Sequence, residues 1–153
     1  MLATQFLRQR RAKTLQVHVD GQLGTGVTAK DLILALVAEL GVNGGSGYVI
    51  EYTGPAIRAL SMEGGRTGMN RAIEDGARAG ISACDQKTRD YVKGRPYSPT
   101  GASWAMAVDY WRTLQSDEDA HFDRVVGLDA SSVKPQVTWG TSPEMVLTIE
   151  DRV

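Results

Sequence analysis

Two kinds of hydrophobic spacing alternate along the first part of the chain. Apolar and polar residues alternate over residues 15–19, which is typical of a half-buried strand. After a glycine-rich break, apolar side chains recur at helical spacing over residues 32–40, with Thr28 placed as the N-cap and Gly41 placed to end the helix. A second strand is expected over residues 48–52. Strand, helix and strand in this order indicate a βαβ unit.

The pattern is less regular beyond the second strand. Pro55 suits the first turn of a short helix, and a longer helix is expected from about Thr67 to Ala79. The other expected elements are a short buried strand at 81–84, a helix at 87–93, a helix capped by Ser103 with Trp104, Val108 and Trp111 on one face, and a strand at 122–128. We therefore predict a three-layer α/β/α domain with a mixed or parallel central sheet over residues 15–130. A basic arm (1–14) precedes it and a C-terminal segment (131–153) follows.

Composition narrows the class of protein. Of the 153 residues, 42% are hydrophobic and 23% are charged, which is the balance of a folded globular protein. The 17 basic and 18 acidic residues leave a net charge of −1, so neither nucleic acid nor a membrane surface is expected as a partner. The longest apolar run, residues 32–38, is too short to span a bilayer, and the charged start is unlike a signal peptide.

The cysteine and histidine residues of the chain give little indication of a metal site or a catalytic nucleophile. The single cysteine, Cys84, excludes an internal disulfide and a cluster of cysteine ligands among these residues, and a reducing cytoplasm is the expected location. Cys84 lies in a short apolar stretch, which favours a buried, inert thiol. His18 and His121 have no companion ligands nearby, so ordinary histidines are favoured over a metal site. The glycines at 44–47 precede a strand, which favours a structural turn over a phosphate loop.

Asn70 and Glu74 are the pair that stands out on chemical grounds. They are four residues apart in an expected helix, so an amide and a carboxylate project from one face and could reach the same ligand. A carboxylate in that position can accept from, or orient, a water molecule, and the amide can donate and accept. By spacing alone, an exposed polar pair without a catalytic role is the favoured interpretation.

Several stretches, in order, resemble the large subunit of bacterial isopropylmalate dehydratases, within the aconitase superfamily. The matching sequence segments are LATQ-FLRQ, VDGQL, GVTAKDLILAL, GGSGYVIEYTGPAIRALSMEG, NRAIEDGARAGISA, YVKGRP, YWRTLQSDEDAHFD and PQVTWGTSPEMV. They cover nearly the whole chain. Aconitase itself carries a looser version of the middle block, whereas PQVTWGTSP and YWRTLQSD favour the dehydratase. The chain is thus identified as an internal segment of such a subunit.

The resemblance implies a hydro-lyase that interconverts 2- and 3-isopropylmalate in leucine biosynthesis. Its [4Fe-4S] cluster carries an open iron that acts as Lewis acid on the departing hydroxyl. The implied partners are the remaining domains of the large subunit, a small swivelling subunit and a small dicarboxylate substrate. Asn70 and Glu74 match the family's active-site asparagine and glutamate, and that glutamate helps handle the water or hydroxide. The cluster-ligand cysteines belong to a downstream region, so this chain is expected to bind no cluster and to be inactive alone.

The chain departs from the family's pattern next to the matched pair. Arg66 and Arg71 replace apolar residues, and Met69 replaces a small one. Burying an unpaired arginine costs on the order of several kcal/mol, so both arginines should be exposed or paired. This pattern is compatible with two functions. The chain could be a catalytic-domain segment of the dehydratase, or a stand-alone binding or scaffold module derived from the family.

Overall fold

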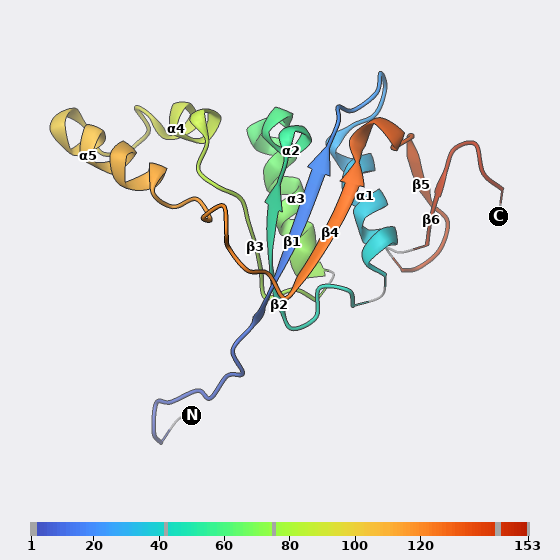
Figure 1. Ribbon diagram of the computed structural model, residues 1–153, viewed down its shortest axis with the longest axis horizontal. Helices are drawn as coiled ribbons and strands as arrows, with labels where there is room; N and C mark the ends of the chain where they lie inside the picture. The colour runs from blue at the N-terminus through green and yellow to red at the C-terminus, as the bar shows by residue number, and fades with distance from the viewer. Residues whose placement is uncertain (1–2, 42, 75, 143–144, 153) are drawn as a thin grey trace.

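The computed structural model describes residues 3–41, 43–74, 76–142 and 145–152, with the backbone alone described at 71–74. Figure 1 shows how the helices and strands are arranged. In chain order they are β1 Lys13–Asp20, α1 Ala29–Leu40, β2 Tyr48–Thr53, α2 Pro55–Ala59, α3 Met62–Glu74, β3 Ala79–Ile81, α4 Gln86–Val92, α5 Gly101–Arg112, β4 Arg124–Asp129, the 3-10 turn η1 Ala130–Ser132, β5 Gln136–Thr138 and β6 Val146–Thr148.

The centre of the molecule is a parallel four-stranded sheet in the order β3-β2-β1-β4. Val17 on β1 pairs with Tyr52 on β2 and with Val126 on β4, so alternate residues of three strands line up on one face. Helices α1 and α3 lie behind that face in Figure 1 and contact one another. The predicted α/β class, with a parallel sheet flanked by helices, is confirmed.

The core forms where the strand alternation meets the apolar stripe of α1. Leu15, Val17 and Val19 of β1 are fully buried, and so are Leu32 of α1 and Ile50 of β2. The opposite face of the sheet carries polar side chains and Val125, which is 60% exposed. Burial of one face only is what an apolar/polar alternation specifies.

Helix α1 has the predicted boundaries because both ends are capped. The backbone amide of Thr28 donates to Asp31 Oδ2 (2.8 Å), and the Thr28 hydroxyl accepts from the Asp31 amide (3.4 Å), which completes a capping box. Gly41 ends the helix at φ 74, a conformation that glycine adopts without strain.

Helix α3 begins and ends earlier than the predicted range of 67–79. Ser61 Oγ accepts from the Gly64 amide (3.1 Å) and starts the helix before the three glycines that obscure it in the sequence. A Cβ on Gly68 would lie 2.7 Å from Ile33 Cδ1, so this glycine lets α3 pack closely on α1. The chain leaves the helix before Ala79, the first residue of β3.

Two smaller predictions are wrong. The strand expected at 81–84 is β3, Ala79–Ile81, whose alignment is set by pairing with β2, and Ile81 is 48% exposed instead of buried. Ser103 lies inside α5, whose N-cap is Thr100. The tail, which shows no clear period, forms an antiparallel hairpin of β5 and β6. The two strands are too short for a periodic signal.

The C-terminal hairpin is attached to the start of α1. The amide of Gln136 on β5 donates to Asp31 Oδ1 (2.7 Å), and both β5 and β6 contact α1. Burial raises the pKa of Asp31, but hydrogen bonds from Thr28 and Gln136 lower it more, so the net pKa lies below its usual value. One carboxylate thus joins two parts of the fold that are 105 residues apart.

Candidate functional site

Helix α3 presents Asn70 at the protein surface. Asn70 is exposed, whereas Met69 beside it is half-buried and packs against the core. Ala77, just beyond the helix, is 5% exposed, so Met69 and Ala77 face inward as expected. The side chain of Ile73, expected on the same apolar stripe, lies outside the described residues.

Only part of the Asn70–Glu74 pair can be located. The backbone of α3 continues to Glu74, which puts the Cα atoms of the two residues one helical turn apart. The side chains of Glu74 and of Arg71 lie outside the described residues. Arg66 is exposed, and its guanidinium donates to the hydroxyl of Tyr91 on α4 at 3.4 Å.

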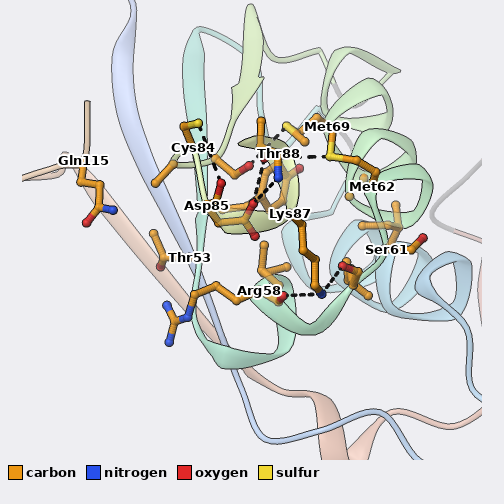
Figure 2. Close-up of a pocket in the computed structure, with 18 residues that line it drawn as sticks. Thr53, Arg58, Ser61, Met62, Met69, Cys84, Asp85, Lys87, Thr88 and Gln115 are labelled. Atoms are coloured by element: carbon orange, nitrogen blue, oxygen red, sulfur yellow. Dashed lines mark hydrogen bonds between the residues drawn. The ribbon is translucent and has the colours of Figure 1, made fainter. Parts of the chain in front are cut away.

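A pocket of about 370 Å³ lies on another side of α3, between α2, the β3–α4 connection and α4 (Figure 2). Its apolar walls come from Ile33, Tyr52, Ile57, Leu60, Met62 and Met69. Polar or charged groups are contributed by Thr53, Arg58, Asp85, Lys87, Thr88 and Gln115. Asn70 does not line it, so the matched family position and the pocket use different faces of the same helix.

Lys87 closes one side of the pocket by binding the end of α2. Its ammonium donates to the carbonyl oxygens of Arg58, Ala59 and Leu60 at 2.8, 2.9 and 2.8 Å. These carbonyls have no partners inside the short helix, and a cation is favourable at a helix C-terminus. Sequence analysis did not single out Lys87, since the carbonyls are 27 to 29 residues away and no local spacing reports such a contact.

Asp85 and Cys84 form the wall where the chain enters α4. Asp85 Oδ1 caps the helix by accepting from the amide and the hydroxyl of Thr88, both at 2.8 Å. Cys84 is half-buried and lines the pocket, so the expectation of a buried thiol is wrong. The chain leaves β3 at Ile81, and the residues after it curve around the pocket instead of entering the core.

The two histidines lie outside this pocket. His18, on the open face of β1, contacts Thr53 Oγ1 through Nδ1 (3.0 Å) and Asp20 Oδ1 through Nε2 (3.2 Å). His121 is exposed. Within the described ranges no three His, Cys, Asp or Glu side chains come together as a metal site would need. The glycines at 44–47 form hydrogen-bonded turns, as expected.

None of the helices in the described part of the chain has the length and apolar character needed to cross a lipid bilayer. Residues 1–153 match the protein-family model described as "Aconitase family (aconitate hydratase)". The match therefore spans both α3 and the pocket.

Proposed function

This chain belongs to the aconitase family, and we propose that it is a segment of the large subunit of a 3-isopropylmalate dehydratase. The observation that carries the proposal is the exposure of Asn70 on a helix whose neighbouring face, through Met69, is anchored in the core. A helix held in this way offers Asn70 to a ligand outside the domain, and the helix backbone continues to Glu74 one turn later. The sequence segments PQVTWGTSP and YWRTLQSD support assignment to the dehydratase over other members of the family.

In this proposal the pair handles the hydroxyl of a small hydroxy-dicarboxylate. The Asn70 amide donates to an oxygen of the substrate and accepts from its hydroxyl. The Glu74 carboxylate accepts a hydrogen bond from the water that is removed or added, and orients it. Both groups act by positioning, and the remaining catalytic groups come from other domains of the subunit and from the small subunit.

Aconitase-family members typically hold a [4Fe-4S] cluster. Such clusters are held by several cysteine thiolates, whereas residues 1–153 contain only Cys84. The described residues also bring no three metal-ligating side chains together. The residues of this segment therefore do not fit the cluster. We propose that the 153-residue chain alone has no hydro-lyase activity and that the complete enzyme acts in the cytoplasm.

A chimaeric large subunit tests this function. Residues 1–153 would replace the matching segment of an active isopropylmalate dehydratase, and hydration of isopropylmaleate and of cis-aconitate would be measured. We expect activity on isopropylmaleate, with a loss of at least about a hundredfold in kcat for Asn70→Ala or Glu74→Gln. Glu39→Gln, an exposed change on α1, is the matched control and should leave the rate unchanged. Activity on cis-aconitate alone would assign another member of the family, and a folded but inactive chimaera would favour the binding-module alternative.

A further inference from the structure

We propose that the pocket between α2, α3 and α4 is a binding site for a small aliphatic carboxylate, separate from the Asn70 face. Its volume of about 370 Å³ lies within the range of small-molecule sites. Half-buried apolar side chains, including Ile57, Met62 and Met69, supply walls for a compact hydrocarbon body. The preference for an anion follows from the polar groups at the pocket's edge.

Most of those polar groups are already engaged within the protein. The Lys87 ammonium donates to three carbonyls, and Asp85 Oδ1 accepts two bonds from Thr88. The Thr53 hydroxyl contacts His18. These interactions leave little capacity for a polar ligand on that side of the pocket.

Arg58 is the exception among the charged groups that line the pocket. Its guanidinium has no hydrogen-bond or ion-pair partner among the described residues. In Figure 2 it extends toward the side of the pocket where Thr53 and Gln115 lie. The lining carries two cations and one carboxylate, Asp85, so an anion is favoured overall. A guanidinium binds a carboxylate through two parallel hydrogen bonds, which makes a carboxylate the matching head group.

Cys84 provides a direct measurement of occupancy. It lines the pocket, is only half-buried and is the single cysteine of the chain. A ligand that fills the pocket should therefore slow alkylation of this thiol by N-ethylmaleimide. The experiment uses the 153-residue chain with 4-methylpentanoate or its neutral analogue 4-methylpentanamide. Mass spectrometry measures the rate at which Cys84 is alkylated.

We expect saturable protection of Cys84 by 4-methylpentanoate and at least about tenfold weaker protection by the amide, because the amide cannot form the charged pair with Arg58. Arg58→Gln should weaken protection by the carboxylate about tenfold, whereas Arg58→Lys should retain part of it. Arg152→Gln is the matched control, since Arg152 is exposed and does not line the pocket.

A second variant tests the location independently of Arg58. A Cβ on Gly65 would meet only Met69 Cε, at 3.8 Å, so Gly65→Leu fits the helix and places its side chain toward the pocket. It should abolish protection without lowering the thermal unfolding temperature, because leucine favours a helix more than glycine does. Three results would each overturn the proposal. They are equal protection of Cys84 by acid and amide, no protection by either compound, and unchanged protection in folded Arg58→Gln and Gly65→Leu. The Asn70 proposal does not depend on this result, since its test uses a different face and substrate.

Discussion

Replacement of Asp31 by asparagine should weaken the fold at two places at once. The carboxylate accepts from the Thr28 amide (2.8 Å), the Thr28 hydroxyl (2.6 Å) and the Gln136 amide (2.7 Å). Asparagine has a single acceptor oxygen, so it can serve the capping box or the hairpin but not both. A hydrogen bond to a charged acceptor contributes about 1.5–3 kcal/mol, and Asp31 is partly exposed. We expect the free energy of unfolding to fall by about 1–2 kcal/mol.

Urea unfolding at neutral pH measures that loss, and hydrogen exchange at residues 136–138 and 146–148 shows whether the hairpin detaches. Glu39→Gln on the same helix is the control, because this exposed change removes a carboxylate without a described hydrogen bond. An unchanged unfolding free energy in Asp31→Asn, with unchanged exchange, would refute the reasoning.

The dependence on pH gives a further check of the same prediction. The folded-state pKa of Asp31 lies below its usual value of 3.8, so the unfolded chain binds the proton more readily. Its contribution is therefore fully present above about pH 4 and is lost as the pH falls through the folded-state pKa. The difference between the parent chain and Asp31→Asn should shrink below pH 3.8 and should be constant between pH 5 and about pH 7.

Two other predictions concern the packing of α2, α3 and α4. Lys87→Met should lower the unfolding free energy by about 1 kcal/mol, because three carbonyls at the end of α2 lose their donor. Thermal or urea unfolding measures this loss, and the control Lys93→Met, an exposed change, should have no effect. Gly65→Ala should stabilise the protein by about 0.5–1 kcal/mol, because alanine favours a helix more than glycine does. Gly68→Ala should be about 1–2 kcal/mol less stable than Gly65→Ala, because its Cβ would lie 2.7 Å from Ile33 Cδ1. Equal unfolding free energies for the two alanine variants would contradict the close packing of α3 on α1.

The first βαβ unit could be predicted closely because its signals are local. The alternation in β1 and the pair Thr28 and Gly41 around α1 depend on neighbouring residues, and these elements form where expected. The start of α3 was missed because its glycines oppose a helix locally, while the contact of Gly68 with α1 that offsets this is tertiary. Local propensity cannot report that contact.

The two candidate sites, the Asn70 face and the pocket, also differ in how far the sequence predicts them. Asn70 could be singled out from its spacing and from the family resemblance, and its exposure follows from the face of α3 that Met69 buries. The pocket could not be predicted, because Arg58, Met69 and Lys87 belong to three different helices, α2, α3 and α4. Their convergence depends on how α2 and α4 pack, and no short stretch of sequence encodes it.

The place of β4 in the sheet has a consequence for synthesis of the chain. β1 is an interior strand, yet one of its two neighbours, β4, is more than a hundred residues away, with Leu15 paired to Arg124. During translation β1, α1 and β2 are complete long before β4 emerges, so one edge of β1 has exposed amides and carbonyls throughout that interval. Closing this long loop is also entropically costly and slow. The unpaired edge of β1 is therefore the point at which a nascent chain can associate with another, and arrival of residues 124–129 ends that exposure.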